Sequence, residues 1–414
     1  MPSATPASNT AARRRTDLSY IPKRSSLHFT DRFNRDYLKA LRKRGDPKAD
    51  AVVAELHRTN GLTNIRDLMG TVRERAAQDP NSVFAEFVRD VESLPEWVDA
   101  KQIERGQQVL AAYSSLMGPA LLAGSLVGGA MFSSAAAVTA MAGNLTYDPA
   151  KRVTETALII IHLAFPGELL KIDGKARVAL ARVRLLHAGL RHWLPASGRY
   201  KRTDEIAINQ HDLAITLALF GYVNLRSLAL MSTHMNREEI DAYMHLWRYA
   251  GYLLGIDEEL LPKSLEEQEE FFLASCIDEA HPDKIPEATK KVLDAMAQDA
   301  NKNSYGIIPY EIARQQLHQL TRYLSGDEYC TGMKIDNLGD NHWSILLTCA
   351  MGRATSFTNH YVPFGEAAIR NLNLFMTQRM INSFEKQKGT LAQGIRVAPD
   401  GFQQARARQP QARL

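Results

Sequence analysis

The sequence has few cysteines, and none of them stands in a metal-binding or redox pattern. Its 414 residues include three, Cys276, Cys330 and Cys349, which are far apart and form no CxxC pair. An odd number at this spacing argues against a disulfide framework and against a zinc ribbon. We therefore expect three buried free thiols in a reducing compartment.

The sequence also lacks the short motifs of several common enzyme classes. It has no HExxH zinc-protease motif, no GxSxG nucleophile motif, no CxxCH site for covalent heme, and no glycine-rich phosphate loop after a predicted strand. The net charge of +4 is small, and much of the basic excess lies near the two ends of the chain. Because no basic face is predicted on the folded part, we expect no nucleic-acid partner.

An export signal is not visible either. Residues 1–20 contain Arg13, Arg14 and Arg15, but the apolar run that a secretion signal requires does not follow them. We therefore expect a cytoplasmic protein. Residues 1–20 and 388–414 have no apolar periodicity, and the second segment is rich in Gly, Pro, Gln and Arg. Both are predicted to be disordered tails on a single domain at 21–387.

What the sequence does contain is helical periodicity along most of its length. The stretches 50–62, 80–94, 237–255 and 365–387 place apolar residues at spacings of three and four, the pattern of an amphipathic helix. Alternation typical of strands is rare. The hydrophobic share of 45% gives ample material for a large core. The predicted fold class is therefore all-α, as a single helical domain.

Residues 106–147 contain no charged side chain. The segment is longer than the ~20 apolar residues that span a membrane. However, it is rich in Gly, Ala and Ser, contains Pro119, and has no flanking cluster of Lys or Arg. We favour buried helices that pack closely against each other or against a flat ligand. Contact with a membrane stays open as the alternative.

The stretch KARVALARVRLLHAGLRHW, followed by Leu, predicts a helix over 175–194 with a polar side. Arg184, His187 and Arg191 have the spacing i, i+3 and i+7, which places them on one side of that helix. An imidazole can bind heme iron, and arginines pair with carboxylates such as heme propionates. From the residues alone, a solvated polar stripe is the alternative. His192 points elsewhere, so it cannot bind the same metal.

This stretch resembles the signature of the family of latex clearing proteins (rubber oxygenases) and mpaB-type oxygenases. In that family the pattern Arg-x-x-His-x-x-x-Arg carries the heme-binding histidine, and here it falls on Arg184, His187 and Arg191. Three more stretches are similar to the family in the same order, namely RVTET (152–156), INQHDLAITLALF (208–220) and YMHLWRYAGYLLGI (243–256). The resemblance implies a globin-like helical core around heme b. It also implies that His187 is the iron ligand and that Arg184 and Arg191 hold the propionates.

The resemblance further implies an oxidoreductase. Members of the family use molecular oxygen to cleave a carbon–carbon double bond in a lipophilic, isoprenoid-like chain. The rubber-cleaving branch has Arg-x-x-Lys-Thr on the oxygen side; here Arg152 and Thr156 match, but Glu155 replaces the lysine. A carboxylate is a poorer ligand for ferrous iron than an amine, but burial can tune it as a proton carrier. We therefore predict Arg152, Glu155 and Thr156 as catalytic residues, with Glu155 moving protons and the substrate left open.

Other interpretations stay open beside this one. A carboxylate near iron also suits a peroxidase- or peroxygenase-like enzyme, and a helical protein that binds heme or lipid without catalysis is the third alternative. From the residues alone, Arg152 and Glu155 fit an i, i+3 ion pair on a helix. His162 fits either the same pocket or the core, His245 fits a structural role, and the polar residues around 209–212 fit a helix cap.

Overall fold

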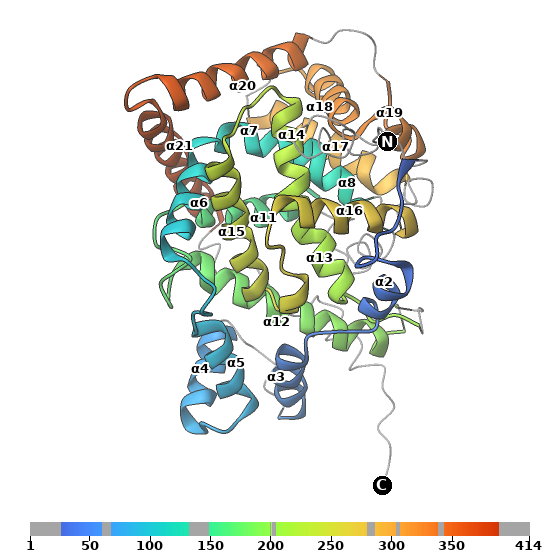
Figure 1. Ribbon diagram of the computed structural model, residues 1–414, viewed down its shortest axis with the longest axis vertical. Coiled ribbons are helices and arrows are strands. Elements are labelled where there is room, and N and C mark those ends of the chain that lie inside the picture. The colour runs from blue at the N-terminus through green and yellow to red at the C-terminus, as the bar shows by residue number, and fades with distance from the viewer. Residues whose placement is uncertain are drawn as a thin grey trace, which may run out of the picture.

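The computed structural model describes residues 26–59, 68–130, 132, 149–198, 200, 204–279, 286–303, 307–337 and 343–388. These residues form helices joined by loops, with no strand among them (Figure 1). The predicted all-α fold class is confirmed. The predicted tail at 1–20 lies outside the described residues, and so does the predicted tail at 388–414 apart from Lys388, where the last helix ends. The domain limits stay predictions.

The N-terminal helices begin at side-chain caps. Asn34, Asp46 and Ser82 each accept a hydrogen bond from the backbone N–H three residues further on, which satisfies a donor that the first turn leaves free. The helices are α2 (Arg35–Leu41), α3 (Pro47–Arg58), α4 (Leu68–Gln78) and α5 (Val83–Glu92). The apolar sides of α3, α4 and α5 form a small second core together with one side of α12 (Lys175–Ala196). These three helices lie together at one end of the molecule, next to α12 (Figure 1).

The described part of the uncharged segment forms closely packed, mostly buried helices. It runs through α6 (Ala100–Ala112), α7 (Ser114–Pro119), η2 (Ala120–Leu126) and α8 (Val127–Ala130), with a 75° bend after α6. A Cβ at Gly106 would lie 2.4 Å from the carbonyl oxygen of Ala242 in α15 (Arg237–Leu253), so glycine lets α6 and α15 approach closely. Residues 131 and 133–147 of the segment lie outside the described residues.

The rest of the chain completes the large core. Its elements are α11 (Pro149–Leu163), α13 (Gln210–Ala218), η3 (Leu219–Val223), α14 (Asn224–Leu230), η4 (Glu258–Leu260), α16 (Leu265–Glu279), α17 (Pro286–Asn303), α18 (Tyr310–Ser325), α19 (Asp327–Gly332), α20 (Trp343–Tyr361) and α21 (Gly365–Lys388). The continuous helix Gln210–Leu230 is long and apolar enough to cross a membrane, but 78% of its most apolar window is buried inside the protein. A core helix of a large domain has the same property.

Helix α12 lies between the two cores and contributes one face to each. Leu180 and Leu194 belong to the large core, whereas Ala181, Leu185 and Ala188 belong to the small core formed with α3–α5. Because successive residues turn by about 100° around a helix, these two sets lie on different sides of α12. The helix ends at Ala196, two residues beyond the predicted end at 194.

Candidate functional site

His187 lies on the side of α12 that faces the large core. It is seven residues from both Leu180 and Leu194, which are buried in that core, and residues seven apart share one face of a helix. The histidine itself is half-buried. Among the described residues, no group of three or more His, Cys, Asp and Glu side chains is placed to bind a metal ion. A single imidazole of this kind is the protein ligand that a porphyrin iron uses, since the porphyrin brings four ligands of its own.

Helix α11 carries the three residues predicted on the oxygen side, and it packs against α12. The structure describes the backbone of Arg152 and Glu155 within α11 but not their side chains, and it places Thr156 in a half-buried position. The ring of His162 lies 6.5 Å from that of Phe165 at the end of the same helix. The fold thus brings the two predicted helices together. The roles of Arg152, Glu155 and Thr156 stay predictions.

A buried glutamine fixes the end of α11. The side-chain N–H groups of Gln107, on α6, donate to the carbonyl oxygens of Leu163 at 3.0 Å and Phe165 at 2.6 Å, and its side-chain oxygen accepts from the N–H of Gly167 at 3.3 Å. The carbonyl oxygen of Leu163 is one that the last turn of α11 leaves without an intrahelical partner, and the other two groups belong to the turn that follows. Gln107 therefore ties the end of α11 and the following turn to α6, a role that was not predicted from the sequence.

The two predicted arginines lie on a different row of α12 from His187. Arg177, Arg184 and Arg191 are seven residues apart, and all three are buried. On a helix this row runs between the side that faces the large core and the side that faces the small one. We call these three residues and their partners the arginine seam. The row that carries His187 is the adjacent one, about 60° away around the helix, so the arginines and the histidine lie on neighbouring rows of α12.

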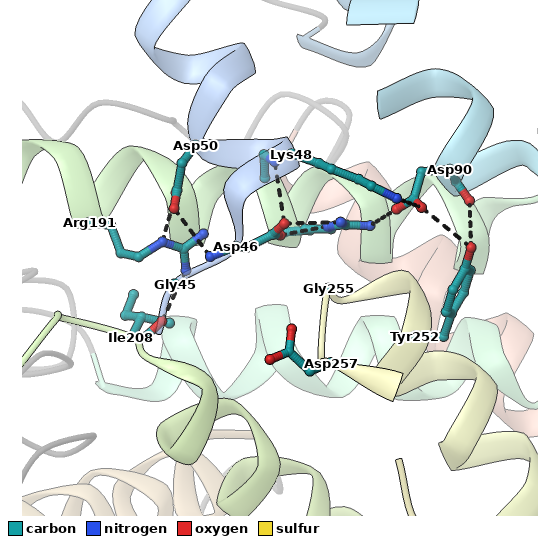
Figure 2. Close-up of polar contacts among 12 residues, drawn as sticks. Gly45, Asp46, Lys48, Asp50, Asp90, Arg191, Ile208, Tyr252, Gly255 and Asp257 are labelled. Atoms are coloured by element: carbon teal, nitrogen blue, oxygen red, sulfur yellow. Dashed lines mark hydrogen bonds and ion pairs between the residues drawn. The ribbon is translucent and has the colours of Figure 1, made fainter. Parts of the chain in front are cut away.

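Arg184 is the centre of the seam. Its Nε donates to Asp46 Oδ2 at 2.6 Å and its Nη2 to Asp46 Oδ1 at 3.0 Å, while Nη1 donates to Asp90 Oδ2 at 2.7 Å. Asp46 caps α3 and Asp90 lies on α5, and Lys48 also pairs with Asp90 (Figure 2). The two-pronged pairing with Asp46 is the strongest geometry for an arginine and a carboxylate. It joins the small core to α12.

The charges at this position reinforce one another. Burial would lower the pKa of Arg184, but hydrogen bonding and charge attraction from Asp46 and Asp90 outweigh it and raise the pKa above its ordinary value. Burial would raise the pKa of Asp90, but the positive charges of Arg184 and Lys48 outweigh it and lower the pKa. Arg184, with 4% of its surface exposed, is therefore charged and paired.

The other two arginines hold the two ends of the seam. Nε of Arg191 donates to Asp50 Oδ1 at 2.7 Å, and its Nη1 donates to the carbonyl oxygen of Ile208 at 3.0 Å (Figure 2). Arg177 donates to three backbone carbonyl oxygens, those of Val91, Leu170 and Ser93. Burial raises the pKa of Asp50, and the charge of Arg191 opposes this without cancelling it.

These contacts bear directly on the predicted propionate ligands. In the structure, Nε, Nη1 and Nη2 of Arg184 all donate to aspartate carboxylates, and Arg191 donates to Asp50 and to a backbone oxygen. These partners are sufficient to explain why Arg184 is buried, whereas Nη2 of Arg191 is buried without a hydrogen-bond partner among the described residues. The assignment of Arg184 and Arg191 to heme propionates stays a prediction.

Two of the stretches that resemble the family, 208–220 and 243–256, also contact the arginine seam. Gly255 has φ +82°, and a Cβ there would lie 2.2 Å from Asp46 Oδ2 and 2.5 Å from Arg184 Nε, so only glycine fits against this ion pair. The side-chain N–H groups of Gln210 donate to the carbonyl oxygens of Gly45 at 2.9 Å and Gly255 at 3.0 Å. The stretches at 208–220 and 243–256 therefore support the contact between α12 and the N-terminal helices.

Other polar residues in those stretches have structural roles. The side chain of Asn209 caps α13 by accepting from the N–H of Asp212, as the capping interpretation predicts. His211 is buried beside Ser275 Oγ at 3.1 Å, and burial lowers its pKa to about 3, so it is neutral at pH 7. His245 accepts a hydrogen bond from the backbone N–H of Asp99 at 3.0 Å, which agrees with a structural role.

The sequence analysis missed Asp46, Asp50 and Asp90. One signal was available, because Arg177, Arg184 and Arg191 repeat every seven residues on a helix that is apolar on both flanks. A buried row of arginines requires carboxylates or carbonyl oxygens opposite it. The sequence does not say which ones, since the partner Asp46 is 138 residues from Arg184 along the chain.

Comparison with known proteins identifies one family model, one relative and one solved structure that are similar to this chain. Residues 113–355 match the family model described as "ER-bound oxygenase mpaB/B'/Rubber oxygenase, catalytic domain". The chain is similar to the rubber oxygenase of Streptomyces sp. (strain K30), with 26% identity over 181 residues, which is 43% of this chain and 44% of that relative. Its fold is similar to that of latex clearing protein LCP in the closed state, with a TM-score of 0.58 and 18% identity, covering 80% of this chain and 90% of that one.

The fold and the site define a class of all-helical proteins. In this class a helix such as α12 lies between two cores, and it presents a histidine, here His187, to the larger core. Within that class, this chain belongs to the family of mpaB-type and rubber oxygenase catalytic domains, because the family model covers more than half of its length. The match includes α11, α12 and the two stretches that meet at the arginine seam. The predicted family is confirmed.

Proposed function

We propose that this protein is a heme b-dependent oxygenase that uses molecular oxygen to cleave a carbon–carbon double bond in a lipophilic, isoprenoid-like substrate. Family membership supports an oxygenase, and the rubber oxygenase among its relatives acts, by its name, on a polyisoprene. The observation that carries the proposal is the position of His187. It lies on the face of α12 that looks into the large core, on a helix that packs against α11. A cytoplasmic location stays part of this proposal.

The residues present fit a heme. A single imidazole in an apolar surrounding is the protein ligand that a b-type heme needs, since the porphyrin supplies the four other nitrogen ligands. Leu180 and Leu194, one helical repeat on either side of His187, belong to the large core and would exclude water from the same face. When bound, the heme would supply oxygen activation, and His187 would hold it.

The remaining chemistry falls to α11. Glu155 stands three residues from Arg152 and one from Thr156, so the three side chains leave neighbouring positions of one helix. A carboxylate at position 155 can hold a proton or release it at its own oxygen, which a lysine cannot do while it binds a metal. We assign proton transfer to Glu155. Arg152 would orient the carboxylate of Glu155, and Thr156 would supply a hydrogen bond on the side where molecular oxygen binds.

A pair of histidine variants tests the heme assignment. His187→Ala should abolish stable heme binding, seen as loss of the Soret band and of heme released by acid–acetone extraction. His192→Ala is the matched control, because His192 is exposed on the same helix and its ring lies 4.8 Å from that of His57 in α3. Equal loss of heme in the two variants, or a purified protein without Soret absorption after heme supplementation, contradicts the assignment.

A second variant tests the oxygen side. Glu155→Gln keeps the size of the side chain but cannot accept a proton. It should keep heme content near normal and lower turnover about 10²–10⁴-fold. Turnover of an olefin with oxygen alone supports the oxygenase, whereas turnover that requires added peroxide selects the peroxygenase-like alternative. A heme-binding protein that turns over neither way is the non-catalytic alternative.

A further inference from the structure

Helix α20 exposes its apolar side. Trp343, Leu347, Phe357 and Tyr361 recur at the helical period along the outward side, together with Leu346 and Met351, and all of them are exposed. The inward side of the same helix is small and partly polar, made of Ile345, Cys349, Gly352 and Ser356. In a helix that only serves the core, the larger apolar side chains would face inward.

The exposed stripe continues through the turn after α20 and along α21. Leu372, Phe375, Met376 and Met380 are exposed on one side of α21, and Val362 and Phe364 are exposed in the turn. We call these residues and the six on α20 the C-terminal apolar surface. Of the twenty large apolar side chains that are exposed in the described part of the chain, twelve belong to it. Figure 1 shows α20 along the outer edge of the molecule, with α21 continuing beside it.

Phe364 is held outward by a strained backbone. It has φ 61°, in the left-handed region that a bulky side chain rarely adopts, and 89% of its surface is exposed. A glycine would avoid this strain at the turn between α20 and α21. The turn itself has a structural role, since the carbonyl oxygen of Phe364 accepts from the N–H of Ala368 at 2.9 Å, at the start of α21. The almost fully exposed ring adds little to the core, and it is available to a partner outside the chain.

Within residues 343–382, which carry this surface, the Asp, Glu, Lys and Arg side chains that form no ion pair with a described residue are all arginines. Between residues 343 and 382 the acidic side chain is Glu366, and it already pairs with Arg105 of α6. Arg353 and Arg379 are exposed, Arg370 is half-exposed, and none of the three forms an ion pair within the described part of the chain. The guanidinium of Arg379 lies over the ring of Phe375, 5.6 Å from its centre.

We propose that the C-terminal apolar surface docks this protein onto a lipid bilayer that carries anionic headgroups. An apolar side flanked by arginines is the composition of a helix that lies in a bilayer interface and attracts anionic lipid. Trp343 and Tyr361 stand at the two ends of α20, and these are the residue types enriched at the level of the headgroups. The surface includes α21 and Phe364, which lie beyond the 113–355 match to the family.

A second copy of this chain fits the same surface less well. A two-fold interface would bring the same patch of both copies together, and with it their arginines. Glu366 is the acid within this surface, and it is already paired, so the like charges would face each other without compensation. A lipid surface supplies the missing negative charge.

Vesicle co-sedimentation of the full-length protein tests the proposal. The protein should bind vesicles of phosphatidylcholine mixed equally with phosphatidylserine, and it should bind pure phosphatidylcholine much more weakly. Added salt should reduce the difference between the two, because it screens the attraction between arginines and headgroups. Absence of binding to either vesicle overturns the proposal, as does equal binding to both at low salt.

Matched variants locate the contact. Leu347→Glu should lower binding to the mixed vesicles by about tenfold or more, because a carboxylate would replace an apolar contact beside anionic lipid. Leu94→Glu is the control, since Leu94 follows α5 and is 50% exposed, compared with 52% for Leu347. Equal losses in both variants would show that binding does not use this surface. Loss of a dimer in Leu347→Glu, with no vesicle binding in the parent, would assign the surface to a second copy.

Phe364→Gly separates docking from folding. Removing the ring should weaken vesicle binding several-fold, whereas relief of the left-handed backbone should leave thermal stability equal or higher. A variant that loses both binding and stability would show that Phe364 packs within the chain, and the proposal would fail. Heme content should be unchanged in all these variants, so failure of the docking proposal is distinguishable from failure of the proposed function.

Discussion

The arginine seam and the C-terminal apolar surface invert the usual arrangement of side chains in opposite ways. At the seam, Arg184 is 4% exposed and Asp46 is 3% exposed, although both carry charge. At the C-terminal apolar surface, Phe364 is 89% exposed. The first inversion is complete within the chain, because each charge meets its opposite. The second inversion leaves apolar area in contact with solvent, since 89% of Phe364 and 58% of Phe375 remain exposed.

The two regions contribute to the protein in different ways. A buried ion pair adds little net stability compared with an apolar contact, but it severely penalises loss of one partner. The seam therefore specifies how α3 and α5 sit on α12, next to the row that carries His187. An exposed apolar stripe contributes nothing to folding and becomes useful only at an interface.

The largest expected effect follows from removing one charge of the seam. Asp46→Asn keeps a side chain that can cap α3 but leaves Arg184 without its two-pronged partner. We expect the free energy of unfolding to fall by about 3 kcal/mol, the lower end for breaking a buried pair. Urea denaturation followed by circular dichroism measures this. Glu55→Gln, which breaks an exposed pair on the same helix, should leave the unfolding midpoint unchanged.

A smaller effect is expected from the glycine that faces the ion pair. Gly255→Ala places a Cβ against Asp46 and Arg184, in addition to the strain of a left-handed alanine. Gly198 also has positive φ, at +67°, but a Cβ there meets nothing within 4 Å. Gly198→Ala therefore measures the backbone strain alone. We expect Gly255→Ala to be less stable than Gly198→Ala by about 2 kcal/mol, in the range for overpacking a filled site. Equal losses of stability in the two variants would show that Asp46 and Arg184 move away from the added Cβ at little energetic cost.

The smallest effect is expected on the outward side of α20. Leu347→Ala should change the free energy of unfolding by less than about 0.5 kcal/mol, as for other exposed positions. Ile345→Ala, two residues away on the inward side, should lower it by about 2 kcal/mol because Ile345 is buried. A large loss in Leu347→Ala that depends on protein concentration would mean that copies of the chain already cover this surface in solution.

Much of the fold could be predicted from the sequence. The periodic stretches at 237–255 and 365–387 became α15 and α21 within two residues at each end, and the stretch at 175–194 became α12. The capping role of Asn209 followed from its residue type before a helix. These predictions succeed because helical periodicity and capping act over a few residues, a range that the sequence displays directly.

The tertiary structure alone decided what each side of a helix meets. The sequence showed that Arg184 and His187 are close on α12, but it did not show that one faces aspartates from α3 and α5 while the other faces the large core. It predicted an amphipathic helix at 365–387, but it did not show that the apolar residues Leu372, Phe375 and Met376 of that helix lie outward. Spacing fixes the angle between side chains around one helix. The partner comes from chain segments far away in sequence, such as Asp46, 138 residues from Arg184, so only the packed fold identifies it.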